Sequence, residues 1–247
     1  MNSYKLIIAY SGTQYHGWQE QKGVATVAGT LQNVFKKVFN HDIKLVAASR
    51  TDAGVHALGQ VAIFRTELSL DPHNLMHAWN ARLPADILIR SAIQYEPQDF
   101  HSQRNVKEKT YYYHFFTKRP LPMVAPYGLF YHKKLDVEKL KACLTLFVGT
   151  HDFRSFCSGD DHESTVSTIN SIQYVYFKKY GVHRIVIKGP RFLRYMIRRI
   201  VGASLAVASS SQPVEHIHYI LKQKNPLHSL PTAAAHGLLL RNITYQT

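Results

Sequence analysis

Residues 49–60 place a carboxylate, a cation and several small residues within one short segment of the 247-residue chain. Asp52 stands two residues after Arg50, a spacing at which the guanidinium can keep the carboxylate ionised and oriented. Small residues surround it, among them Ala53 and Gly54, so that a flat partner could approach the backbone closely. An ionised carboxylate on such a loop is suited to nucleophilic or electrostatic catalysis.

A simpler interpretation exists for the four residues Thr-Asp-Ala-Gly at 51–54. This sequence is also typical of a turn in which the Asp side chain accepts hydrogen bonds from nearby backbone amides. The apolar runs at residues 43–48 and 61–64 predict a strand on each side. Both interpretations therefore place Asp52 on a loop between two strands.

An aromatic segment at residues 109–116 predicts a strand. Alternation puts Tyr111, Tyr113 and Phe115 on one face of this strand. Tyr112, His114 and Phe116 lie on the other face. At least one of the two faces must belong to the core. The other could stack on nucleic-acid bases, which contributes about 1–3 kcal/mol per base.

A basic segment follows Pro190, where the spacing of apolar residues predicts a helix. At 100° per residue, Arg191, Arg194 and Arg198 share one face of that helix. The helix has no acidic residue to pair with them. The arginines are either a solvated polar face or a binding face for phosphates or a carboxylate. The expected buried residues are Phe192, Met196, Ile197, Ile200, Val201 and Leu205.

The charge of the chain indicates a polyanionic partner. Thirty Lys and Arg stand against sixteen Asp and Glu, a formal net charge of +14, and nucleic acid is the leading candidate. The apolar stretches are too short to span a membrane, and the N-terminus lacks the pattern of a secretory signal. We therefore expect a soluble, cytoplasmic protein with no membrane partner.

Metal and disulfide chemistry have little support in the sequence. Two cysteines, Cys143 and Cys157, are too few for a disulfide framework or a zinc site. Fifteen histidines occur, but their close pairs lack a carboxylate at metal-site spacing. We expect reduced thiols and no metal. The histidine pairs are His73 with His77 and His216 with His218.

The order of predicted elements is β-α-β-β-α-β, and it occurs twice. In the first half, strands at 4–10, 43–48, 61–64 and 87–95 accompany helices capped by Thr26 and Asp71. In the second, strands at 109–116, 166–177, 182–187 and 238–245 accompany helices that begin at Asp136, at Pro190 and near Pro213. The predicted fold class is α+β, with two ferredoxin-like halves and mainly antiparallel sheets. The halves are residues 1–105 and 106–247, and the acidic stretch 158–164 is predicted to be a solvated insertion.

The string Arg-Thr-Asp-Ala-Gly-Val-His-Ala at 50–57, followed by Gly-Gln-Val at 59–61, closely resembles the active-site motif of the tRNA pseudouridine synthase A family. Further segments resemble the family's other motifs, and the likeness covers nearly the whole chain. They lie at residues 10–13 with 17–19, at Asn80 with 83–84 and 86–87, at 99–101 with 109–111, and at 198–202.

The resemblance implies a pseudouridine synthase fold with an active-site cleft between the halves. Asp52 stands at the position of the family's catalytic aspartate and Arg50 at its accompanying arginine. Tyr111 matches the tyrosine that packs on the target base, and Arg198 the basic residue that faces the aspartate. The sequence departs from the family pattern at Ser11, Gln103, Arg104 and Arg199.

The implied activity is isomerisation of uridine to pseudouridine in the anticodon stem-loop of tRNA. It needs no cofactor and no metal, because the uracil leaves through N1 and returns through C5 without gain of any atom. The resemblance also implies a homodimer. The residues expected to contact the RNA are Lys109, Arg154, Arg191, Arg194 and Arg199.

A non-catalytic tandem of RRM domains is the alternative. Lys109, Tyr111, Tyr113 and Phe116 match four positions of the RRM RNP1 pattern. Thr110 replaces the glycine of that pattern, and a binding platform gives no reason for the Asp52 loop.

Overall fold

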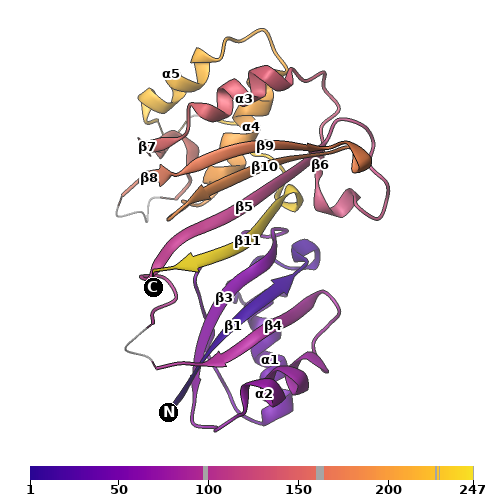
Figure 1. The fold of residues 1–247 in the computed structure, drawn as a ribbon, viewed down its shortest axis with the longest axis vertical. Coiled ribbons are helices and arrows are strands. Elements are labelled where there is room, and N and C mark those ends of the chain that lie inside the picture. Colours follow the sequence, from indigo (N-terminus) through magenta and orange to yellow (C-terminus); the bar gives the residue numbers. More distant parts are fainter. Residues whose placement is uncertain (97–99, 160–163, 226, 228, 247) are drawn as a thin grey trace. The chain divides into compact units, whose positions relative to one another are not determined.

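The computed structural model describes residues 1–96, 100–159, 164–225, 227 and 229–246. The chain divides into two compact units, Met1–Lys107 with Leu239–Thr247, and Glu108–Leu238 (Figure 1). Residue 99 of the expected motif at 99–101 and residues 160–163 of the expected insertion lie outside the described residues.

Unit 1 contains a sheet in the order β4 (Ile87–Gln94), β1 (Asn2–Tyr10), β3 (His56–Thr66) and β11 (Leu238–Tyr245). β1 runs antiparallel to both of its neighbours, whereas β11 runs parallel to β3. The short β2 (Val46–Ala47) pairs antiparallel with β3. The loop that carries Asp52 connects β2 to β3, as the two flanking apolar runs predict.

Two helices, α1 (Val27–Phe39) and α2 (Pro72–Asn80), pack on this sheet. Thr26 and Asp71 accept N-cap hydrogen bonds from the backbone amides of residues 29 and 74, at 3.3 and 2.9 Å, which confirms both predicted caps. Phe35 of α1 and Trp79 of α2 pack edge to face at 4.8 Å, and both contact Phe64 of β3. Both helices therefore cover the same face of the sheet.

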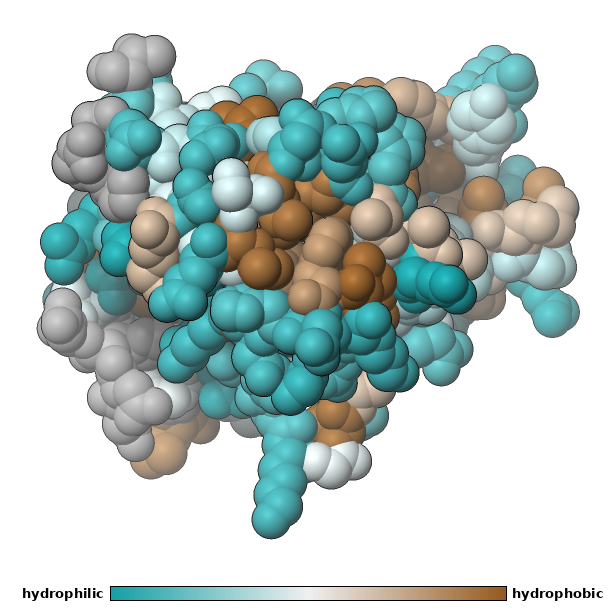
Figure 2. Space-filling view, turned by 90° about the horizontal axis from the view of Figure 1, so that it is seen from below, coloured by the Kyte–Doolittle hydropathy of each residue, from teal (hydrophilic) through white to brown (hydrophobic). Residues whose placement is uncertain are grey.

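A groove lies between α1 and α2, with a volume of about 590 Å³. Figure 2 views the molecule from the lower side of Figure 1 and shows a group of apolar residues surrounded by hydrophilic ones. The groove holds no carboxylate, thiol or hydroxyl that could do chemistry. Its lining residues are Val34, Lys37, Val38, Ala78, Ala81 and Arg82.

Unit 2 is built on the antiparallel strands β5 (Val106–Phe116), β10 (Val182–Gly189) and β9 (Ser171–Phe177). β6 (Leu129–Phe130) joins β5 in parallel, and β7 (Gly149–Asp152) pairs with β8 (Val166–Ile169) in a separate two-stranded sheet. The helices are α3 (Val137–Thr145), α4 (Met196–Ala208) and α5 (Glu215–Gln223). Asp136 caps α3 through the amide of residue 139, at 3.0 Å. The predicted α+β class with mainly antiparallel sheets is confirmed.

At least one face of the aromatic strand β5 belongs to the core, as predicted. Tyr111, Tyr113 and Phe115 are at most 5% exposed; on the other face Tyr112 and His114 are half-buried, and Phe116 is 3% exposed. The set that contains Tyr111 is therefore the core set.

The last strand differs from its expected place in the second half. Leu239 and Leu240 of β11 pair with β3, and Gly59 of β3 has no room for a side chain, because a Cβ there would lie 2.6 Å from the Arg241 carbonyl oxygen. The Tyr245 hydroxyl donates to the carbonyl of Ser102 at 3.1 Å. The chain therefore returns to unit 1 at its end, and unit 1 is not a continuous segment.

Candidate active site

The backbone on both sides of Asp52 is held by hydrogen bonds within unit 1. The Thr51 carbonyl accepts from the amide of Trp18 at 3.1 Å, and the Thr51 hydroxyl lies 2.8 Å from the Tyr10 hydroxyl. The Asp52 carbonyl accepts from the amide of Val55 at 3.1 Å. Thr51 is buried, whereas Asp52 is half-buried. The loop thus presents its carboxylate from a fixed backbone.

Two glycines bring residues 11–19 directly against this loop. Gly17 has a φ of +91°, and a Cβ there would lie 2.6 Å from the Thr51 carbonyl oxygen. A Cβ on Gly12 would lie 2.1 Å from the Val55 carbonyl oxygen. The amide of Gly54 donates to the carbonyl of Tyr15 at 3.2 Å. These two glycines were part of the sequence motifs, but their contact with the Asp52 loop could not be read from them.

Two further side chains complete the support. The buried His56 accepts through Nδ1 from the amide of Gly12 at 3.0 Å. The Tyr15 hydroxyl donates to Asp86 Oδ1 at 2.7 Å, and burial, together with Asp86, raises the pKa of Tyr15 above its ordinary value. The segments around residues 12, 52 and 86 therefore meet in one place. Gly12, His56 and Asp86 stood in the sequence motifs without an assigned role, whereas Tyr15 was not a motif position.

Arg50 is exposed, whereas Asp52 is half-buried. The part of Arg50 in the chemistry stays a prediction.

Unit 2 positions Tyr111 and Arg198. The Tyr111 ring is 5% exposed and packs edge to face on Phe192 at 5.3 Å. Arg198 is half-buried, and its Nε donates to the Ala233 carbonyl at 2.8 Å. Gly202, one turn further along α4, permits this contact, because a Cβ there would lie 2.0 Å from the carbonyl oxygen of residue 231.

The predicted helix from Pro190 is wrong at its start. α4 begins only at Met196, after Tyr195 in the left-handed region with a φ of 63°. The Arg191 carbonyl accepts from a serine side chain and the Arg194 carbonyl from the amide of Ser158, so neither is available for helical bonding. Arg191, Arg194 and Arg198 therefore do not share one helical face.

Even so, Arg191 lies near Lys109, and Arg194 and Arg198 both lie near the Tyr195 ring. Burial first, and then the charge of Arg191, lowers the pKa of Lys109 to about 8. Arg191 also donates to the Ser164 carbonyl at 3.2 Å. The guanidinium carbons of Arg194 and Arg198 lie 5.2 and 5.0 Å from the Tyr195 ring centroid. Arg191 and Arg194 are exposed.

Arg199 is engaged inside the fold. Its Nη1 donates to the Cys157 carbonyl, and its buried Nε has no hydrogen-bond partner. Its contact with RNA stays a prediction.

The described residues contain no group of three or more His, Cys, Asp or Glu side chains that could hold a metal ion. Cys143 and Cys157 are buried and free, and burial raises the pKa of Cys143 to about 11. The exposed pair His73 and His77 approaches to 3.0 Å between Nε2 atoms. Among the residues that the structure describes, no helix has the length and apolar character of a membrane span.

The two-unit α+β fold carries Asp52 on a fixed loop in one unit and exposed arginines in the other, and the family match shows that the chain is an RNA-modifying enzyme. The chain belongs to the tRNA pseudouridine synthase family, whose model matches residues 6–103 and 144–246.

The similarity to individual family members covers full lengths. The chain is 34% identical to tRNA pseudouridine synthase A of Pseudothermotoga lettingae, over 99% of this chain and 100% of that one. It is 36% identical to tRNA pseudouridine synthase A of Acetivibrio thermocellus at the same coverage. Among solved structures, the archaeal box H/ACA sRNP Nop10–Cbf5 complex aligns with 95% of this chain and 46% of that chain, at 12% identity and a TM-score of 0.32. This last likeness is too low to add to the family assignment.

Proposed function

We propose that this enzyme isomerises uridine to pseudouridine in the anticodon stem-loop of tRNA, with Asp52 as its catalytic carboxylate. The observation that carries the proposal is the Asp52 loop itself, whose backbone is bonded on both sides and is contacted by Gly12 and Gly17. A capping turn needs its own side chain bonded to the backbone, but it has no need of a second loop packed against it.

The chemistry follows from the reaction. The bond between N1 and C1′ breaks, the uracil turns, and a bond between C5 and C1′ forms. C5 loses its proton and N1 gains one, so that atoms balance without a cofactor. The uridine must leave its stack before a carboxylate can reach it. Tyr111 lies on the core face of β5 and is 5% exposed. We propose that the extruded uracil packs against that exposed part, so that its contribution is at most the about 1–3 kcal/mol of a fully stacked base. Arg198 and Arg50 are proposed to stabilise charge on and around Asp52.

Phosphate contacts supply the rest of the binding. Lys109, Arg154, Arg191 and Arg194 are the proposed contacts, and the net charge of +14 favours them all. We further propose that the enzyme acts in the cytoplasm as a homodimer. Sedimentation of the active enzyme at micromolar concentration checks the dimer, and a monomer would contradict it.

The test is an incubation of the protein with an unmodified tRNA transcript in buffer and salt, followed by mapping of pseudouridine. Asp52→Asn should lower the single-turnover rate by at least about 100-fold, the lower end of what one catalytic side chain contributes. Its tRNA affinity should change little, because phosphate contacts dominate binding.

Asp42→Asn is the matched control, since Asp42 is an exposed carboxylate paired with Lys36 at 2.9 Å. It should react at the wild-type rate. Binding of tRNA by the wild type without any pseudouridine would favour the RRM alternative, and product outside the anticodon arm would refute the proposed target.

A further inference from the structure

His73 and His77 lie four residues apart in α2, a spacing that places two side chains on the same face of a helix. Both side chains are exposed, whereas Leu75 and Trp79 of the same helix are buried. The two Nε2 atoms lie 3.0 Å apart and the ring centroids 4.3 Å apart. The two imidazoles therefore meet at the same ring nitrogen on the outer face of α2.

The helix that carries this pair is fixed at both ends. Asp71 caps its first turn by accepting a hydrogen bond from a backbone amide at 2.9 Å. In its last turn, Trp79 Nε1 donates to the Leu31 carbonyl at 3.1 Å. The side chain of Asn80 forms two hydrogen bonds with the backbone of Ile89, at 2.8 and 2.9 Å. The backbone under the two histidines is thus set in advance, which reduces the conformational freedom lost when a ligand binds.

The separation of the two nitrogens agrees with that of two neighbouring ligands of one metal ion. With metal–nitrogen bonds of about 2.0–2.1 Å, two ligands at 90° lie about 2.9 Å apart, and two at the tetrahedral angle about 3.3 Å apart. The observed 3.0 Å is closer to the first value. Angles of 90° occur in square-planar and octahedral complexes, and Cu²⁺ and Ni²⁺ combine such geometry with a preference for imidazole.

In the free protein, the same distance fits a hydrogen bond in which one neutral ring donates to the other. A metal ion would take the place of the shared proton, because an imidazole nitrogen must be unprotonated to bind it. The lack of a carboxylate at this spacing argues against a catalytic zinc site. A site of two imidazoles completed by water does not need one.

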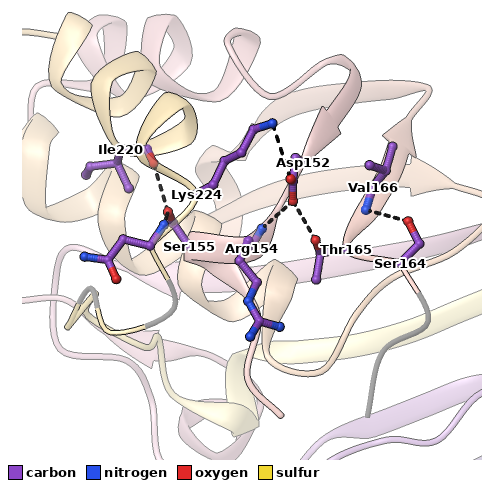
Figure 3. Close-up of polar contacts among 9 residues, drawn as sticks. Asp152, Arg154, Ser155, Ser164, Thr165, Val166, Ile220 and Lys224 are labelled. Carbon is purple, nitrogen blue, oxygen red and sulfur yellow. Dashed lines mark hydrogen bonds and ion pairs between the residues drawn. The ribbon is translucent and has the colours of Figure 1, made fainter. Parts of the chain in front are cut away.

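A second polar cluster, around Asp152 in unit 2, fits a cation less well. Its Oδ1 accepts from the amide of Arg154 at 3.1 Å and from the Thr165 hydroxyl at 2.6 Å (Figure 3). Its Oδ2 lies 3.5 Å from Lys224 Nζ, and this ammonium group repels a further cation. The Asp152 carboxylate is therefore engaged within the fold, whereas the histidine pair faces solvent.

We propose that His73 and His77 form a binding site for a divalent transition-metal ion, Cu²⁺ or Ni²⁺, with water in the remaining coordination positions. The ion would link two successive turns of α2 and so stabilise the helix against unfolding. Neither histidine belongs to the Asp52 loop or to the proposed phosphate contacts. The site therefore goes beyond the proposed function and does not depend on it.

The test is a titration of the purified protein with Cu²⁺ in a weakly coordinating buffer, read as dissociation constants and as the electron paramagnetic resonance of the bound ion. The wild type should bind one Cu²⁺ tightly, with the spectrum of an ion that has two nitrogen ligands. His73→Gln and His77→Gln should each weaken this site at least about 100-fold, since two linked ligands bind about 10²–10⁴ times more tightly than either alone. Glutamine is a good helix former, so both variants should keep α2.

His216→Gln and His218→Gln are the matched controls. These two histidines of α5 are only two residues apart, about 200° around a helix, so they do not share a face. Both variants should bind Cu²⁺ like the wild type. Addition of Ni²⁺ should slow hydrogen exchange in α2 of the wild type and of both controls, but not in His77→Gln.

A wild type that binds Cu²⁺ no more tightly than His77→Gln would overturn the inference, as would an equal loss of affinity in His218→Gln. A tight site that persists in the double variant His73→Gln/His77→Gln would place the ion elsewhere and would also overturn it. Because these measurements do not involve pseudouridine formation, none of their outcomes changes the proposed function.

Discussion

Gly17 packs against the Asp52 loop, and its φ of +91° is one that few other residues adopt. Gly17→Ala places a methyl group 2.6 Å from the Thr51 carbonyl oxygen, so the Asp52 loop must shift. A displacement of about 1 Å can cost on the order of 100-fold in rate, and we expect a loss of that size in single turnover. The tRNA affinity should stay near that of the wild type, because the phosphate contacts lie elsewhere in the chain.

Gly23→Ala is the control for backbone strain alone. Gly23 also has a positive φ, +82°, but nothing lies within 4 Å of a Cβ there. It should cost some stability and leave the rate unchanged. Equal rate losses in both variants would mean that strain, and not contact with the Asp52 loop, is the cause.

Lys109 should make tRNA binding sensitive to pH. Because its pKa is lowered to about 8, the free enzyme loses this charge as the pH rises from 7 to 9. We expect the affinity to fall over that range at constant ionic strength. Lys109→Arg should flatten the profile, since a guanidinium stays charged. Superimposable profiles for wild type and Lys109→Arg would exclude Lys109 from the binding surface.

At the scale of elements, His183 joins the three central strands of unit 2. Its ring stacks on Phe115 at 4.7 Å and contacts Tyr176 at 4.6 Å, and its nitrogens bond to the hydroxyls of Tyr174 and Thr117 at 2.6 and 3.1 Å. Burial lowers the pKa of His183 below its ordinary 6.5. The folded state therefore favours the neutral imidazole.

The stabilising effect of neutral His183 should be complete above pH 6.5 and should be lost as the pH falls through the lowered pKa, because the unfolded chain takes up the proton first. Urea unfolding between pH 7.5 and 5 checks this. His183→Gln should be less stable but should depend less on pH, whereas His132→Gln, at an exposed position, should follow the wild type. Parallel profiles for wild type and His183→Gln would contradict the assignment.

The helix ends show where prediction from the sequence works and where it fails. The caps at Thr26, Asp71 and Asp136 were predictable because a short polar side chain before an apolar period has one favoured use. The start of α4 was not, since the helical period continues through residues 191–195 although the carbonyls of Arg191 and Arg194 are bonded elsewhere. Periodicity reports which side chains could share a face, but it does not report what competes for the backbone.

For the whole molecule, charge and α+β class could be predicted from composition and element order, and the Asp52 loop from its motif. The return of β11 to unit 1 could not. Alternation along residues 238–245 indicates a strand and its two faces, but nothing in it selects a partner strand. The contacts around Asp52 were equally out of reach, because they join residues that lie 33 to 44 positions apart in the sequence, a separation that local patterns do not encode.

A chain that ends at Leu240 tests this arrangement. It lacks the bond from Tyr245 to Ser102, the 2.9 Å bond from the amide of Gln246 to Asn105, and the contact of Arg241 with Gly59. All three partners belong to unit 1. Hydrogen exchange should therefore accelerate around residues 100–105 and in β3, while β9 and β10 of unit 2 keep their protection. Loss of protection confined to β9 and β10 would show that the last strand stabilises the second half, as element order alone suggests.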